Sequence, residues 1–141
     1  SIEGVMITLR CTRKLLKLVG GVTVEDPPAP TSVLGNWYAN VIPTVAGELI
    51  VFANERTLLS VALHIELLAE AWGPLAPHFV TQVYNLLRLI GVPEHVAERE
   101  TAEMQEVEFA KTASRSVLGS LNEISLHRAR TSAQAVPIRG G

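Results

Sequence analysis

Cysteine is almost missing from this sequence, since Cys11 is the only one among its 141 residues. A single thiol forms no intramolecular disulfide, which suits a reducing compartment. No apolar run approaches the roughly 20 residues that a membrane-spanning helix needs, and no secretory signal is visible. These absences predict a soluble cytoplasmic protein with no membrane partner.

Aromatic residues are also scarce, at 5% of the chain, whereas hydrophobic residues make up 48% and charged residues 18%. This is the composition of a folded protein with a mostly aliphatic core. The length fits a single domain. A net charge of −2 creates no global field that would attract nucleic acid or anionic lipid.

Charge is unevenly spread along the chain. An acidic stretch occupies residues 94–108, and the last thirty residues are basic. Near the start lies a basic cluster, formed by Arg10, Arg13, Lys14 and Lys17. Such a run is usually a solvated face, although it is also what an anionic partner would bind, and both interpretations stay open.

The first half of the chain predicts strands. Residues 6–11 alternate in the strand manner, and Thr12 is placed to cap a short helix over 13–19. Three further strands are expected at 36–42, 48–53 and 58–65, joined by short connections that favour an antiparallel meander.

Two details of this region are specific. Pro43 is expected to stop the strand that precedes it, because proline lacks the N–H that a strand donates. The strand at 48–53 is apolar on both faces, which indicates a central strand covered on both sides.

The second half predicts helices. A short helix at 66–72 should end at Gly73-Pro74, and the strongest helical periodicity covers 75–90. Pro93 suits the start of another helix. Ser114 should cap the last one, which carries an apolar stripe of Val117, Leu118, Leu121 and Ile124. A strand is expected between them, over residues 105–111.

Together these elements predict an α+β fold, with a mainly antiparallel sheet of about five strands packed with four or five helices. We expect a single domain over residues 6–130, followed by a C-terminal tail at 131–141. Residues 1–5 are expected to be foreign to the natural protein, with Met6 as its start.

Known site motifs do not occur. No two histidines lie three or four residues apart, and there is no cysteine pair, so we expect no metal site. The glycine-rich phosphate loops and the nucleophile elbow are absent, and we expect no cofactor. Cys11 stands near two arginines that would activate an exposed thiol, but its alternation predicts a small buried apolar residue.

A polar group separates two apolar strands at Asn54, Glu55 and Arg56. One interpretation is hairpin chemistry, because asparagine tolerates left-handed geometry and charges in a turn are solvated. The other is a binding loop on the rim of the sheet. We favour the hairpin, and we keep the rim loop as a candidate site.

A second polar group stands where the last strand gives way to the last helix. It consists of Lys111, Ser114, Arg115 and Ser116. Helix N-termini favour anions, so these residues are the best anion-binding candidate in the chain. An ordinary helix cap explains them equally well.

Four segments carry a family resemblance: 6–12, 34–40 (Leu-Gly-Asn-Trp-Tyr-Ala-Asn), 54–58 (Asn-Glu-Arg-Thr-Leu) and 111–122 (Lys-Thr-Ala-Ser-Arg-Ser-Val-Leu-Gly-Ser-Leu-Asn). They resemble a family of small bacterial proteins known only as a domain of unknown function. The resemblance spans residues 6–123 and includes no catalytic signature. It implies a bacterial cytoplasmic origin and brings no activity with it.

Two functions remain as hypotheses, and whether the protein is an enzyme stays open. The first is a non-enzymatic binding or interaction module that self-associates as a homo-oligomer. The second is a nucleic-acid-binding or ribonuclease-like, toxin-type protein that uses a basic face. In its enzymatic version, His127 would act with Lys111 and Arg115 in acid–base chemistry.

Overall fold

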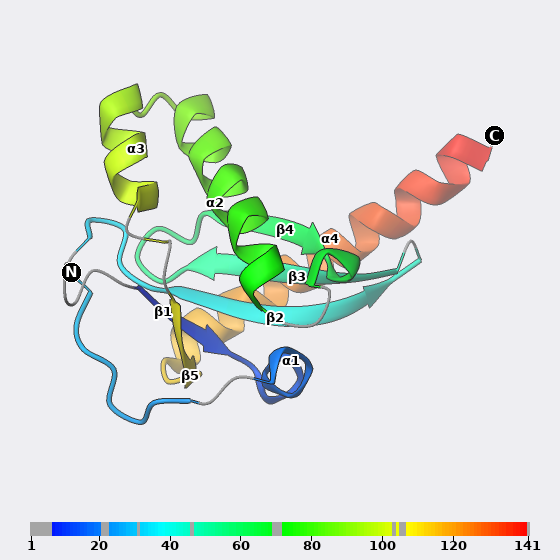
Figure 1. Ribbon diagram of the computed structural model, residues 1–141. Coiled ribbons are helices and arrows are strands. Elements are labelled where there is room, and N and C mark those ends of the chain that lie inside the picture. The colour runs from blue at the N-terminus through cyan, green and yellow to red at the C-terminus, as the bar shows by residue number, and fades with distance from the viewer. Residues whose placement is uncertain are drawn as a thin grey trace.

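The computed structural model describes residues 7–20, 23–30, 32–45, 47–68, 72–102, 104 and 107–140. Residues 1–5 and Met6 therefore lie outside the described part of the chain. Helices cover both faces of a single sheet (Figure 1). The strands are β1 (Ile7–Cys11), β2 (Trp37–Thr44), β3 (Gly47–Asn54), β4 (Ser60–His64) and β5 (Val107–Lys111). The helices are α1 (Arg13–Val19), the 3-10 helix η1 (Ile65–Leu68), α2 (Trp72–Leu89), α3 (Glu94–Ala102) and α4 (Arg115–Gly140).

The strand order is β4-β3-β2-β1-β5. The predicted meander is confirmed, because β2, β3 and β4 pair antiparallel in sequence order. The prediction of a mainly antiparallel sheet is wrong for the remaining two strands, β1 and β5. β1 pairs in parallel with both β2 and β5, so the α+β sheet is mixed. Both parallel pairs follow from long connections that include helices and return the chain to the same end of the sheet.

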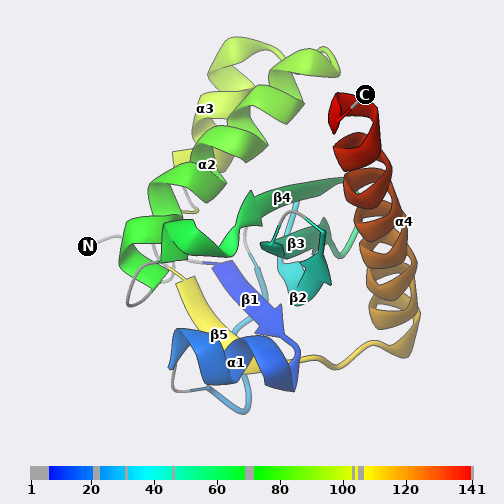
Figure 2. The same cartoon turned by 90° about the vertical axis from the view of Figure 1, so that its right-hand side faces the viewer.

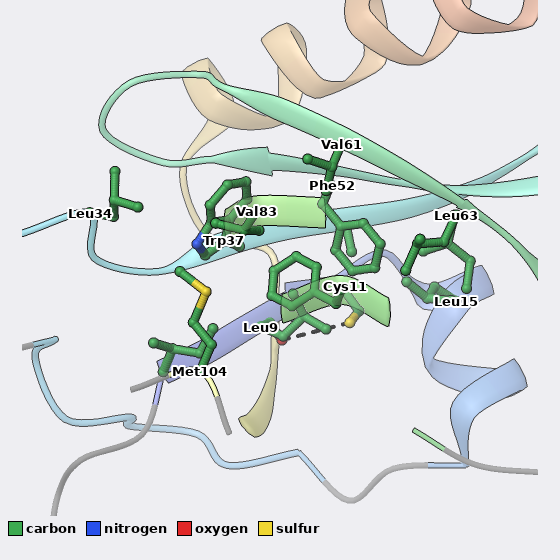
Figure 3. Packing of buried hydrophobic residues seen from close by; sticks show 14 of the residues in the cluster. Leu9, Cys11, Leu15, Leu34, Trp37, Phe52, Val61, Leu63, Val83 and Met104 are labelled. Carbon is green, nitrogen blue, oxygen red and sulfur yellow. Dashed lines mark hydrogen bonds between the residues drawn. The ribbon is translucent and has the colours of Figure 1, made fainter. Parts of the chain in front are cut away.

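The first face of the sheet is covered by α1, α2 and α3. Its core includes Trp37 and Phe52 from the sheet and Phe79 from α2. The ring of Phe79 meets Trp37 edge-on, with centroids 5.5 Å apart, and lies 4.5 Å from Phe52. Figure 3 shows Trp37, Phe52 and Met104 in this cluster. Three of the seven aromatic residues thus lie together in the centre of the core, where their burial contributes most.

The second face is covered by α4. Leu121 is fully buried there against Tyr38 and Val51, and the expected apolar stripe of the helix packs around it. α4 continues through residues 131–140, into the stretch that the sequence predicts as a tail. In the described part of the chain, no helix has the length and hydropathy to span a membrane.

Each edge strand of the sheet is contacted at one residue by another part of the chain. On the β4 edge, Arg128 of α4 donates to the backbone carbonyl of Ser60 at 3.2 Å and to its hydroxyl at 3.1 Å. On the β5 edge, Thr23 forms a parallel bridge with Phe109. The neighbouring N–H of Val24 donates to the Phe109 carbonyl at 2.9 Å.

Three local predictions are wrong. Pro43 does not stop β2 but lies within it. The N–H of Val41 bonds to the Asn40 side chain rather than to β3, so the nitrogen of Pro43, two residues on, also points away from β3. No pairing with β1 extends that far along β2, and a missing N–H there costs nothing.

The other two concern helix ends. Gly73 and Pro74 lie in the first turn of α2, where N–H groups have no intrahelical partner and proline is tolerated. The short helix before them is η1, a 3-10 turn. Thr12 occupies the N-cap of α1, but its hydroxyl donates to Asn40 at 2.8 Å rather than capping the helix.

Candidate functional site

The parallel strands β1 and β5 end side by side, with Cys11 opposite Lys111. After β1 the chain enters α1, whose Leu15 and Val19 belong to the core of the first face. After β5 it enters α4, which covers the second face. Figure 2 shows β1 and β5 as neighbours, and α4 lies across the sheet from α2. In open sheets, ligands bind at such a point, where connections leave neighbouring parallel strands toward opposite faces.

Among the residues that the structure describes, two cavities open at this point. The first, which we name the Arg13 cavity, has a volume of about 280 Å³. The second, the Glu25 cavity, has a volume of about 340 Å³. Lys111 and Thr112 line both. The Arg13 cavity is completed by Cys11, Arg13 and Leu16, and the Glu25 cavity by Arg10, Thr23, Val24, Glu25 and Ala113.

Three cations line the two cavities: Arg10, Arg13 and Lys111. Arg10 donates to the backbone carbonyl of Lys111 at 2.7 Å, which ties the end of β1 to the end of β5. Among the described residues none of the three forms an ion pair. Their charge is therefore available to a ligand, with Glu25 as the acidic side chain in the described lining.

Cys11 lies at the wall of the Arg13 cavity but is only 1% exposed. Its thiol donates to the Leu9 carbonyl at 3.6 Å. Burial raises the pKa of this thiol from 9.0 to about 12. It stays protonated at neutral pH and is a poor nucleophile, which supports the interpretation as a small buried residue.

The four residues of the candidate anion site at the start of α4 do not come together at one place in the structure. The N–H of Ser114 donates to the Tyr38 hydroxyl at 2.8 Å, and its own hydroxyl accepts from the Val117 N–H at 3.2 Å. Ser114 is thus a working helix cap. Arg115 and Ser116 are exposed in the first turn and are not part of the described cavity walls. Of the four residues, Lys111 lines the cavities, and anion binding by the group stays a prediction.

The four residues of the basic cluster are likewise separated in the structure. Arg10 and Arg13 line the cavities, whereas Lys14 lies 3.8 Å from Glu48 in an exposed ion pair of small energetic effect. Lys17 is exposed in the last turn of α1, where a cation favours the helix end.

The candidate rim loop lies at the opposite end of the sheet, where Asn54 pairs with Trp37 at the start of β2. Asn54 is fully buried, and its side chain bonds to the backbone of its own hairpin and of the preceding loop. Glu55 accepts from the Asn36 N–H at 3.1 Å, and Arg56 donates to the Val33 carbonyl at 2.8 Å. These contacts fasten the hairpin to residues 32–36 and support its structural interpretation.

Two lining residues, Thr23 and Glu25, have no signal in the sequence. They belong to a connection without periodicity, and they reach the cavity only because that connection bridges to β5. Thr112 lies in the polar segment that the sequence singles out, but its place in the cavity walls depends on a parallel pairing that the sequence does not predict.

Other candidate chemistry does not gather here. His127 lies twelve residues beyond Arg115 on α4, which is about 18 Å along a helix axis. Within the described residues, no three side chains of His, Cys, Asp or Glu come together as metal ligands.

The fold and its cavities define a class: a three-layer protein with a mixed sheet and basic cavities at the ends of two neighbouring parallel strands. Within that class, the chain belongs to the family described as "Domain of unknown function (DUF6933)", whose model matches residues 8–133. No curated protein and no solved structure matches the chain.

Proposed function

We propose that this protein is a non-enzymatic binding module whose ligand carries an anionic group, bound in the Arg13 cavity. One observation carries the proposal. Lys111 and Arg13, about a hundred residues apart in sequence, line one cavity at the ends of β1 and β5. Cations brought together without an ion pair in the described part of the chain repel each other, and an anion between them removes that cost.

The lining suits a phosphate or carboxylate group. A guanidinium presents a planar fork of donors that matches such oxygens, and an ammonium adds a mobile point charge. Thr112 adds a hydroxyl. No catalytic step is part of the proposal, because the Cys11 thiol stays protonated and His127 lies three turns of helix from Arg115.

Titration calorimetry with inorganic phosphate and pyrophosphate at low salt tests this function. We expect binding that weakens about tenfold or more in Arg13→Ala and in Lys111→Ala, since a charge-assisted hydrogen bond contributes roughly 1.5–3 kcal/mol. Lys17→Ala is the matched control, because it removes an exposed cation from the same helix outside the cavities. Equal losses in all three variants would point to a general charge effect and count against the site.

The proposal includes self-association, and it also assigns the protein to the cytoplasm of a bacterium. The structural support for self-association is the end of α2, where Leu89 is 82% exposed and Ile90 is 53% exposed. Light scattering after gel filtration measures the oligomeric state directly. A clean monomer at high concentration removes this part of the proposal and leaves the anion site untouched.

Nucleic-acid binding is the alternative, because Arg10, Arg13 and Lys111 place positive charge at one end of the sheet. Binding of this kind weakens steeply with salt, since it releases counterions from the phosphate backbone. Fluorescence anisotropy with single-stranded RNA and DNA over a salt series tests it, with Arg10→Ala and Lys111→Ala expected to weaken binding. No binding even at low salt would eliminate the alternative.

A further inference from the structure

The two cavities differ in charge. In the described walls, the Arg13 cavity holds two cations and no acid. The Glu25 cavity also holds a carboxylate, which is exposed and forms no ion pair within the described residues. A second phosphate in the Glu25 cavity would face that carboxylate and be repelled. The anionic part of a ligand therefore belongs in the Arg13 cavity.

Glu25 brings a different capacity to its own cavity. An ionised carboxylate only accepts hydrogen bonds, a guanidinium only donates, and threonine hydroxyls do both. An ammonium group would satisfy Glu25 but would meet Arg10 and Lys111, and an apolar group would offer no hydrogen-bond partner to Glu25 or Lys111. Neutral hydroxyl groups, which donate to Glu25 and accept from Arg10, fit this set of side chains. A carboxylate that receives paired sugar hydroxyls is a known arrangement at such strand ends.

Lys111 and Thr112 line both cavities, which places the two side by side and within reach of one ligand. We propose that the ligand is a phosphorylated polyol, with its phosphate in the Arg13 cavity and neighbouring hydroxyls on Glu25. This inference rests on the proposed anion-binding function and adds the ligand class. The same chemistry, a pentose phosphate with free neighbouring hydroxyls, occurs in a free sugar phosphate and at the 3′ end of an RNA strand, and the experiment separates these two sources.

The test compares inorganic phosphate with ribose 5-phosphate by titration calorimetry on the full chain. We expect ribose 5-phosphate to bind at least about tenfold more tightly, the effect of one added charge-assisted hydrogen bond. Glu25→Ala should abolish that preference while phosphate binds as before or slightly better, since a negative charge is removed. Asp26→Ala is the matched control, because it removes the same charge from the next residue, which is not part of the described cavity walls.

Failure of this inference is distinguishable from failure of the proposed function. Phosphate binding without a preference for ribose 5-phosphate, or a preference that survives Glu25→Ala, overturns the polyol and leaves the anion site standing. Binding of neither compound overturns both. An RNA octamer with a free 3′ end, whose terminal ribose carries both hydroxyls, forms the last arm. If it binds more tightly than ribose 5-phosphate and depends on Glu25, the polyol is the end of an RNA; otherwise it is a free sugar phosphate.

Discussion

Replacing Asn54 by alanine should destabilise the fold strongly, because this side chain joins the β3–β4 hairpin to the loop before β2. Its Nδ2 donates to the carbonyls of Leu34 at 2.9 Å and Asn36 at 3.3 Å. Its Oδ1 accepts from the N–H groups of Arg56 and Thr57 and from the Thr57 hydroxyl, each at 3.0 Å. The residue is fully buried, so water does not replace these bonds at the side chain.

The magnitude follows from what each partner loses. The carbonyl of buried Leu34 would be left unpaired, which costs about 1–3 kcal/mol. The carbonyl of Asn36 keeps a second donor, the Glu55 N–H at 3.0 Å. Arg56 and Thr57 are exposed residues, so their groups lose only the net value of a bond, about 1 kcal/mol each. We expect a total loss of about 4–6 kcal/mol, a large share of the 5–15 kcal/mol that typically separates folded from unfolded domains.

Urea denaturation followed by circular dichroism measures this loss. Thr57→Ala, which removes one hydroxyl from the same group, should cost about 1 kcal/mol. Asn85→Ala, on the exposed side of α2, should change stability by less than about 0.5 kcal/mol. An Asn54→Ala variant within 1 kcal/mol of the wild type would refute the reasoning, because it would show that these bonds do not hold the hairpin to the loop.

Three further predictions concern single groups. The pKa of the Cys11 thiol is 9.0 in the unfolded chain and about 12 in the folded one. The free energy of unfolding should therefore fall as pH rises between these values, and Cys11→Ala should flatten that slope. Iodoacetamide at pH 8 should accordingly modify Cys11 only after unfolding. Tyr38→Phe leaves the Ser114 N–H without its partner and should cost about 1 kcal/mol in thermal denaturation. Glu100→Ala removes the carboxylate that accepts from Val33 and Leu34 and should cost about 2 kcal/mol, with a larger hydrogen-exchange effect in residues 32–36 than elsewhere.

The parts of the fold that the sequence predicts are those that a residue pattern controls directly. Alternation and helical spacing report which side chains share a face, and they locate the meander, α2 and the apolar stripe of α4. Ser114 is found as a cap because capping is a local interaction.

The parts that the sequence misses depend on partners that lie far away in the chain. Alternation in residues 6–11 shows the inward face of β1 but not that both of its neighbours run parallel to it. Proline usually breaks a strand because it lacks an N–H. Pro43 is tolerated within β2 because its nitrogen faces away from β3, on the side where the pairing with β1 has already ended.

The same distinction between local residue patterns and distant contacts applies to the candidate site. The cations of the site are visible as charge clusters, but their meeting depends on the β1–β5 pairing. The contribution of Glu25 depends on a single bridge between an irregular segment and β5.

At each margin of the sheet one residue is already engaged, Ser60 by the guanidinium of Arg128 and Phe109 by the Thr23–Val24 backbone. A strand from a second molecule would have to displace these groups before it could pair along the full length of either margin. An assembly of several copies through helix surfaces would leave both groups in place, and it could form or dissociate without the sheet being opened.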